Sequence, residues 1–365
     1  MKIVAQRSFA TLVALTALAC ATTSATACTG IRLQAKDGAI IYGRTLEFGT
    51  DLSSNLMIIP REIAFQGTTE SGKPGLTWRT KYGAAGLNGL GQTALVDGVN
   101  EKGLASGIFL MPGYAKYQQV SAEEEARSLA PWELVTWILT NFATVDEVRK
   151  ALPEIKVGSV KFDGALLPLH YVVHDAAGNS LVVEYLDGAL SVRDNPVGVI
   201  TNSPDFDWHL KNLSNYVNLR ADNAKPETID GLKIGQFGQG SGLLGMPGDF
   251  TPPSRFVRAV ILSHAVAAVE TGEETVRQAF HVLDSFDIPS GAVRAANDEL
   301  TAYELTQWTS ATDTKNLVYY FHSYDNRRVR QLDLKKVDLN AGQVLVIPSR
   351  GQEDFDDLTP GKAGR

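Results

Sequence analysis

The chain has 365 residues, of which 44% are hydrophobic and 21% charged, and its formal net charge is −7 at pH 7. This composition is typical of a globular protein and excludes a disordered or fibrous chain. The mild acidic surplus excludes nucleic acid as a partner, because phosphate binding needs clustered Lys and Arg, and no apolar run approaches the roughly 18 to 20 residues that span a bilayer.

Residues 1–27 have the pattern of a secretory signal peptide. Lys2 and Arg7 give a positive start, Phe9 to Ala21 is apolar, and residues 25–27 form a small-residue cleavage site. This pattern predicts an exported protein, periplasmic or secreted, with no membrane association in its mature form. Of the two cysteines, at positions 20 and 28, only Cys28 remains after cleavage, as the first residue.

A lone cysteine at the mature N-terminus has three interpretations. It can be a small apolar residue that happens to follow the cleavage site. It can be the acylated residue of a lipid-anchored periplasmic binding protein, although the Leu three places upstream that is usual in such signals is absent. The third interpretation is chemical, because a terminal Cys combines a thiol of pKa about 8.5 with an α-amine of pKa about 7.7–8.0 that can accept a proton.

The predicted elements begin, in chain order, with a β-hairpin. Its strands are residues 28–33 and 39–44, joined through Lys36-Asp37-Gly38. The following elements are strands at 90–97 and 104–109, helices at 121–141 (with Ser121 as cap and Glu124 three places on) and 144–151, a hairpin of 169–174 with 181–186, a strand at 197–201, helices at 206–219, 254–269 and 272–284, and strands at 301–310, 316–322 and 342–347.

This order predicts an α+β layered domain in which helices cover antiparallel sheets. Neither a repeat nor a Pro/Ser-rich linker interrupts the chain after the leader. We therefore expect residues 28–365 to form a single domain, with residues 351–365 as a loose tail.

Two motifs are rejected as cofactor or metal sites. Residues 240–245 match GxGxxG, but Pro247, Pro252 and Pro253 follow, and no helix can begin there as a dinucleotide site requires. His170 and His174 lie on a predicted strand, where they are about 13 Å apart and too distant to share one ion. Because GxSxG, P-loop and HExxH patterns are also missing from the sequence, we predict neither a metal nor an organic cofactor.

Three polar segments carry candidate site residues. Arg44 and Glu47 end the first hairpin close to Cys28, Asn202 follows an apolar run at a predicted strand end, and Arg255 follows a proline-rich loop. Each alone has a structural explanation, as a surface ion pair, a turn residue or a solvated helix residue. A terminal thiol, a donor amide and two cations, taken together, indicate a catalytic site more specifically than any one of them does.

These segments are also where the chain resembles the choloylglycine hydrolase family, which comprises penicillin V acylases and bile salt hydrolases among the N-terminal nucleophile hydrolases. The resemblance is carried by six motifs in order: Cys-Thr-Gly at 28, GRTLEF at 43–48, VNEKGLASG at 99–107, PGYAKY at 112–117, NPVGVITNSP at 195–204 and GDFTPPSRFVRA at 248–259. It implies a four-layer αββα sandwich across the mature chain, no cofactor, and a homotetramer.

The resemblance also implies a role for each candidate. The nucleophile falls on Cys28, the two family arginines on Arg44 and Arg255, and the oxyanion-hole asparagine on Asn202. Glu47 takes the place of an acidic residue that is usually Asp. A second oxyanion position, often Asn or Tyr, aligns with Leu110, which can serve only through its backbone N–H.

The expected reaction is hydrolysis of a linear carbon–nitrogen amide through an acyl-thioester. The two arginines favour the thiolate, the α-amine transfers the proton, and an apolar pocket holds the acyl group. The candidate lining residues are Phe48, Trp78, Leu110, Met111, Trp132 and Trp208. The leader and the GRTLEF form resemble the Gram-negative acylases, so we rank penicillin V (phenoxyacetyl-penicillin) first, acyl-homoserine lactones second, and conjugated bile acids as the alternative.

Overall fold

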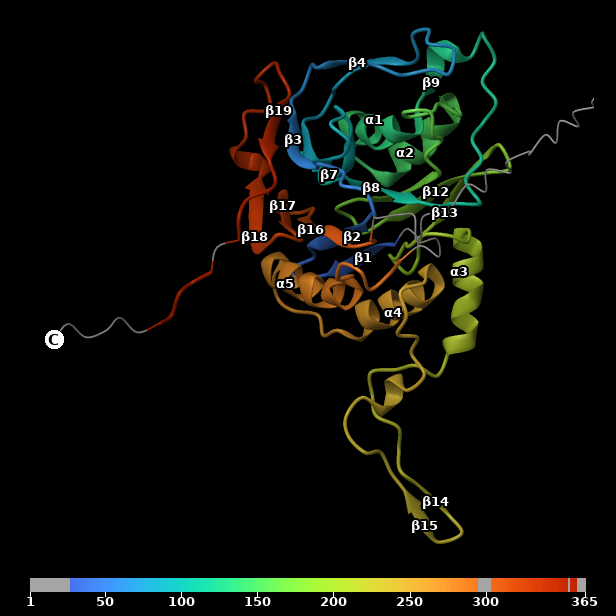
Figure 1. Cartoon of the computed structure of the whole chain (residues 1–365), viewed down its shortest axis with the longest axis vertical. Helices are drawn as coiled ribbons and strands as arrows, with labels where there is room; N and C mark the ends of the chain where they lie inside the picture. Colours follow the sequence, from blue (N-terminus) through green and yellow to red (C-terminus); the bar gives the residue numbers. More distant parts are fainter. Residues whose placement is uncertain (1–26, 295–302, 354, 360–365) are drawn as a thin grey trace, which may run out of the picture.

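A computed structural model describes residues 27–294, 303–353 and 355–359. Two antiparallel sheets lie face to face, and helices cover the outer face of each (Figure 1). In Figure 1, α1 and α2 lie above the sheets and α4 and α5 below them. The predicted four-layer αββα sandwich is therefore confirmed.

The first sheet holds the chain segment that begins with Cys28. Its strands, in spatial order, are β1 (Cys28–Gln34), β2 (Ile40–Glu47), β16 (Thr306–Asp313), β17 (Val318–Ser323) and β18 (Asn326–Asp333). Helix α4 (Pro252–Ala265) packs on β1, and α5 (Gly272–Leu283) packs on β2 and β16. Every residue of β2 is buried, because one face meets α5 and the other meets the second sheet.

The second sheet forms the opposite half of the core. Its strands, in order, are β13 (Ala189–Asp194), β12 (Ser180–Leu186), β11 (Leu169–His174), β8 (Ala105–Leu110), β7 (Leu95–Asn100), β6 (Ala84–Asn88), β3 (Asn55–Ile59) and β19 (Leu345–Pro348). Helix α1 (Leu134–Asn141) packs on β7 and β8, and α2 (Val145–Ala151) begins after Thr144, whose hydroxyl accepts the N–H of Glu147. In the described part of the chain, none of the helices has the length and apolarity that a membrane span requires.

Smaller elements surround this frame. They are the pairs β4 (Ala64–Gln66) with β5 (Thr77–Arg79), β9 (Ser128–Leu129) with β10 (Lys156–Val157), and β14 (Glu227–Ile229) with β15 (Leu232–Ile234), and the helix α3 (Phe206–Asn212). Residues 220–246, which we call the arm, carry β14 and β15 and extend away from the body (Figure 1). The side chains of Leu232 and Phe237 on the arm are exposed.

The predicted helix at 121–141 is wrong for most of its length, because only its last part, α1, is helical. Ser121 donates its N–H to Glu124 Oε2 at 3.2 Å, but its hydroxyl donates to Glu123 and does not cap a helix. The chain then forms short 3₁₀ turns on either side of β9. Pro131 lacks the N–H that a helix needs and disfavours a helical conformation at the residue before it.

Three other predicted elements are also corrected. The strand expected at 90–97 is largely the turn between β6 and β7, where Leu90 and Gly91 have φ of 55° and 67°, a left-handed backbone that strands do not adopt. The segment at 197–201 joins the first sheet only through a single bridge, between Ile200 and Gly30. The helix expected at 206–219 ends at Asn212 and continues as a 3₁₀ turn.

At the C-terminal end, β16 begins at Thr306, later than expected, and residues 301–302 lie outside the described residues. The described residues of the expected tail carry neither a helix nor a strand. The strand expected at 342–347 is β19, which starts at Leu345.

Candidate active site

Strand register brings Asn202 beside Cys28. Cys28 is the first residue of β1, where it pairs with Leu46 of β2 along one edge. Along the other edge, Gly30 and Ile200 exchange backbone hydrogen bonds of 2.8 and 3.1 Å, and two residues further this register places Asn202 opposite Cys28. Gly30 is needed for this approach, because a Cβ there would lie 2.8 Å from both Ile200 Cγ2 and Phe109 Cζ.

The carboxamide of Asn202 joins three parts of the site. Its Oδ1 accepts the N–H of Cys28 at 2.8 Å and a hydrogen bond from Arg255 Nη2 at 2.6 Å. Its Nδ2 donates to the carbonyl of Leu110 at 2.7 Å. Because an amide nitrogen carries two hydrogens, the second N–H can donate to a reacting oxygen.

The end of β8 presents an open backbone edge to this carboxamide. Met111 donates its N–H to Pro168, so the N–H groups of residues 109 and 111 point toward β11, and those of Ile108 and Leu110 point the other way. Arg44 and Asn202 donate to the carbonyls of Ile108 and Leu110 on this same edge. The N–H of Leu110 therefore lies on the edge where a second oxyanion donor is expected.

Arg44 is buried behind Cys28. It stands on the face of β2 that meets the second sheet, and Nη1 donates to the Ile108 carbonyl at 2.6 Å. The guanidinium carbon lies 4.2 Å from the Phe109 ring centroid and 5.2 Å from that of Trp308. The positive charge of Arg44 acts on the Cys28 thiol and also on the buried carboxyl groups of Asp97 and Glu47.

Arg255 ties helix α4 to the first residues of β1. Its Nη1 donates to the Cys28 carbonyl and, at 2.9 Å, to Thr29 Oγ1, while Nη2 holds Asn202 Oδ1. Burial lowers the pKa of Arg255 to about 10, against the opposing effects of Glu47 and Cys28. The guanidinium therefore remains charged at neutral pH and fixes Cys28 and Asn202 relative to each other.

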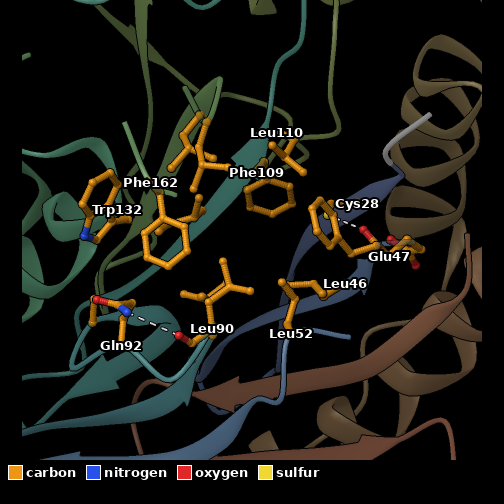
Figure 2. A pocket seen from close by; sticks show the side chains of 17 residues that line it. Cys28, Leu46, Glu47, Leu52, Leu90, Gln92, Phe109, Leu110, Trp132 and Phe162 are labelled. Atoms are coloured by element: carbon orange, nitrogen blue, oxygen red, sulfur yellow. Dashed lines mark hydrogen bonds between the residues drawn. The ribbon is translucent and has the colours of Figure 1, made fainter. Parts of the chain in front are cut away.

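Glu47 ends β2 on the face that meets the helices. Its Oε1 accepts the hydroxyl of Thr306 at 2.8 Å, whereas Oε2 is buried and finds no hydrogen-bond partner in the described ranges. Burial raises the pKa of Glu47 to about 8. In Figure 2 its side chain lies on the side of Cys28 away from Trp132 and Phe162, so it faces the backbone end of Cys28 rather than a bound acyl group.

The pKa of the Cys28 thiol is raised overall by burial, although Arg44 and Arg255 each lower it, as expected. Burial is the largest effect and raises it, Arg44 is the next and lowers it, and Glu47 raises it again. The thiol also lies 3.8 Å from the backbone carbonyl of Glu47. In the structure Cys28 is still joined to Ala27, so its nitrogen is an amide that carries no charge to oppose burial.

An apolar cavity of about 700 Å³, counted to its open mouth, begins at the thiol (Figure 2). The expected residues Phe48, Leu110 and Trp132 line it. Gln92 is its one polar residue other than Cys28 and Glu47, and its Nε2 donates to the Leu90 carbonyl. The remaining lining residues, which sequence analysis missed, are Leu46, Leu52, Gly89, Leu90, Ala94, Val96, Ile108, Phe109, Phe162, Leu167 and Leu169.

Three expected lining residues lie elsewhere. Met111 is fully buried in the turn after β8, where its N–H bonds Pro168. Trp208 is 41% exposed, because the periodicity of α3 turns Phe206 and His209 inward instead. Trp78 stacks on Phe65 in the β4–β5 pair and donates Nε1 to Thr140.

Seven of the eleven missed residues come from two segments, 89–96 and 162–169, each a loop with the start of the strand that follows, and these segments meet only when β6, β7 and β11 assemble. Their sequence signal is weak, because a few apolar residues in a turn do not indicate which partner they face. Phe162 and Leu167 were detectable only as apolar residues in a segment with no predicted element.

Comparison with known proteins places these features in context. The profile of the linear amide C-N hydrolases, choloylglycine hydrolase family, matches residues 28–347. A bile salt hydrolase/transferase of Clostridium perfringens is 32% identical over 321 residues, covering 87% of this chain and 95% of that protein. A penicillin V acylase of Pectobacterium atrosepticum is 28% identical over 321 residues, covering 82% of this chain and 78% of that protein.

Solved structures give the same picture of the fold. A conjugated bile acid hydrolase from Clostridium perfringens superposes with a TM-score of 0.81 at 29% identity, covering 91% of this chain and 100% of that one. A penicillin V acylase from Agrobacterium tumefaciens superposes with a TM-score of 0.71 at 25% identity, covering 88% of this chain and 91% of that one.

Proposed function

The chain belongs to the choloylglycine hydrolase family of linear amide C–N hydrolases, and from this premise we propose that Cys28 is the nucleophile that cleaves the amide of a largely apolar acyl group. One observation carries the proposal. The thiol opens on one side to the apolar cavity, while Asn202 and two buried arginines surround its other side.

We further propose that cleavage after Ala27 makes Cys28 the first residue. The family profile begins its match at residue 28, which supports this boundary. Two solved structures of the Clostridium perfringens hydrolase are of variants, one at a cysteine and one at an arginine sixteen residues further on. Cys28 and Arg44 have the same separation, which supports pairing them in one site.

In this mechanism the free α-amine of Cys28 takes the thiol proton as sulfur attacks the amide carbon. The oxyanion receives hydrogen bonds from the second Nδ2 hydrogen of Asn202 and from the Leu110 N–H. The ammonium returns its proton to the leaving amine as the carbon–nitrogen bond breaks. Water, deprotonated by the same amine, then releases the acid from the thioester. Loss of one oxyanion donor costs about 3 kcal/mol in such sites.

For the substrate we propose a conjugated bile acid, which reverses the ranking that the sequence suggested. The bile salt hydrolase of Clostridium perfringens is more similar to this chain than the penicillin V acylase of Pectobacterium is, in identity and in the share of the protein covered. The earlier ranking rested on the leader, which concerns export, and on the GRTLEF form, which supplies three of the residues that line the cavity, Leu46, Glu47 and Phe48.

Penicillin V and acyl-homoserine lactones remain a second candidate because of the cavity itself. Apart from the amide of Gln92, one N–H of which donates to Leu90, and the indole N–H of Trp132, its side chains beyond the thiol offer a hydroxylated acyl group no polar partner. Burying unpaired hydroxyls is costly, so this lining favours a phenoxyacetyl or fatty acyl group.

A direct comparison of kcat/KM decides between the two. We would assay glycocholate, with three ring hydroxyls, and glycolithocholate, with one, beside penicillin V and a long-chain acyl-homoserine lactone on one preparation of processed protein. The bile acid proposal expects the highest kcat/KM on a conjugated bile acid. Activity restricted to penicillin V or the lactone would overturn the bile acid proposal. Inactivity on every amide would overturn the proposal that Cys28 is a hydrolytic nucleophile.

Export and lipid attachment are tested together by the mass of the mature N-terminus. Our proposal expects an unmodified chain that begins at Cys28, in the periplasm or the medium. A diacylglyceryl adduct on Cys28 would block the thiol and support instead the lipid-anchored binding protein. A chain that retains residues 1–27 and is active would exclude the α-amine as the proton acceptor.

A further inference from the structure

Two buried histidines lie directly behind Asn202, and the reaction steps above do not use them. His209 of α3 donates Nε2–H to the Asn202 carbonyl at 2.8 Å. His170 of β11 lies with Nε2 3.1 Å from the Thr201 carbonyl. Both histidines are 2% exposed, so each of these contacts is shielded from water.

The hydrogen bond between His209 and the Asn202 carbonyl requires one particular tautomer of the neutral imidazole. A backbone carbonyl can only accept, so the proton of the neutral ring must sit on Nε2. Burial lowers the pKa of His209 to about 4, which keeps the ring neutral at working pH. Nδ1 is buried and has no hydrogen-bond partner within the described residues. The ring therefore makes one polar contact, and that contact is to the peptide of Asn202.

The same ring also reaches the arginine side of the site. It stacks on Phe256, with ring centroids 4.6 Å apart and planes 18° from parallel. Phe256 directly follows Arg255 in α4, and the guanidinium of Arg255 donates to Asn202 Oδ1. His209 thus connects the backbone of Asn202 with the helix that holds its side chain.

The other ring nitrogen of His170 is buried without a hydrogen-bond partner among the described residues. This nitrogen, Nδ1, lies 3.6 Å from Glu184 Oε1, and that oxygen accepts the N–H of Phe206 at the start of α3 at 2.9 Å. The Thr201 hydroxyl donates to the Pro252 carbonyl at 3.1 Å. Hydrogen bonds to His170 of β11 and to Pro252 of α4 therefore hold residue 201.

Such support is needed because sheet pairing stops short of Asn202. The segment joins β1 only through the bridge of Ile200 with Gly30, and no strand continues through residues 201–202. An oxyanion donor must be held accurately, since a misplacement of about 1 Å can cost about 100-fold in rate. The backbone contacts of the two histidines supply what the sheet does not.

We propose that His209, supported by His170, is a positioning residue that aims the carboxamide of Asn202 at the oxyanion. This inference rests on the proposed function, because it assigns the histidines to the acyl-transfer site of Cys28. It explains why two histidines are buried beside a reaction that uses neither as acid, base or ligand.

The test compares two substitutions at one position. His209→Phe keeps an aromatic ring for the stack on Phe256 but removes the donor. His209→Gln restores an N–H close to the place of Nε2. Lys211→Gln, at an exposed residue of the same helix α3, is the matched control and is expected to leave kcat unchanged.

We expect His209→Phe to lower kcat by about 10- to 100-fold with KM changed by less than about 2-fold, and to slow acyl-enzyme formation equally. His209→Gln is expected to recover most of that loss. Crystal structures give a readout that does not depend on activity: the distance from Asn202 Nδ2 to the Leu110 carbonyl, now 2.7 Å, should lengthen only in the Phe variant.

Several results would overturn the inference. They are wild-type kcat in His209→Phe, an equal loss in both variants, or an unchanged Asn202 position in the structure of the Phe variant. Failure of the proposed function looks different, because the wild-type protein would then hydrolyse none of the amides while the crystallographic comparison still reports on the histidine.

Discussion

Removal of residues 1–27 is expected to change how the stability of the protein depends on pH, through Glu47. In the unprocessed chain the nitrogen of Cys28 is an uncharged amide, and burial raises the pKa of Glu47 to about 8. In the processed chain the same nitrogen is an amine that becomes an ammonium below its ordinary pKa of about 7.7–8.0, and Glu47 Oε2 is the buried carboxyl atom without a partner among the described residues. An opposite charge nearby favours the carboxylate, so we expect processing to lower the pKa of Glu47.

The size of the effect follows from linkage. The pKa of Glu47 rises on folding from an ordinary value of 4.5 to about 8, and each pKa unit corresponds to about 1.4 kcal/mol. The stabilisation is therefore about 5 kcal/mol and fully present below pH 4.5, and it is lost as pH rises through 8. Between pH 7 and 9, where an ordinary Glu contributes no pH dependence, the unprocessed chain loses about 1 to 2 kcal/mol through this residue.

The assay is urea unfolding of both chains at pH 5, 7 and 9. Glu47→Gln in the unprocessed chain is the matched control, because the amide keeps the size and removes the titration. The difference between wild type and Glu47→Gln cancels the other titrating groups. We expect this difference to fall with pH in the unprocessed chain and to change much less in the processed chain.

Two results would refute the reasoning. If Glu47→Gln follows the same pH profile as the unprocessed wild type, Glu47 is not the buried neutral carboxyl inferred above. If processing leaves the profile of the wild type unchanged, the new ammonium does not interact with Glu47, and the residue does not hold the terminal amine.

Three further predictions concern the thiol, the oxyanion donor and the arm. Cys28→Ser is expected to keep its melting temperature but lose more than about 10³-fold in kcat, since the thiolate is the nucleophile; near-normal amide hydrolysis would exclude Cys28. Asn202→Asp keeps an acceptor for Arg255 but loses the N–H, so steady-state assays should show kcat lower by about 10²–10³, and an unchanged kcat would exclude the carboxamide as a donor. On the arm, Leu232 of the isolated two-stranded hairpin and Phe237, which follows it, are exposed, and we propose that they lie in the interface of the expected homotetramer. If so, replacing both with Ser should reduce the mass from light scattering below that of a tetramer without changing kcat, whereas an unchanged mass would contradict this interface.

Local patterns were sufficient to predict the part of the site that one hairpin builds. Alternation of side chains and a tight turn define β1 and β2, and the register that follows sets Arg44 and Glu47 near Cys28. The helices expected at 144–151 and 272–284 also form, as α2 and α5, and Thr144 and Thr271 cap them. In these segments the sequence-local preference and the final fold agree.

Contacts between distant segments could not be derived in this way. Asn202 reaches Cys28 through a single bridge 170 residues away in sequence, from Ile200 to Gly30, and no alternation pattern marks such a bridge. The acyl cavity depends on loops from three parts of the chain. Trp208 illustrates the error that results: its apolar surface suggested a pocket, whereas helical phase turns it outward and turns His209 toward Asn202.

The geometry around Cys28 also explains how cleavage can switch on the chemistry without rebuilding the site. Before cleavage, the Cys28 N–H already donates to Asn202 Oδ1 at 2.8 Å, and Arg255 already binds the Cys28 carbonyl. An amine at the same nitrogen can make the same hydrogen bond to Asn202 Oδ1 and still has further hydrogens. Because Cys28 is the first residue of β1, its neighbours on both strand edges are fixed by residues that follow it, and cleavage removes none of them. The change that cleavage brings is therefore one of basicity at a single atom, in a site whose other groups are already in place.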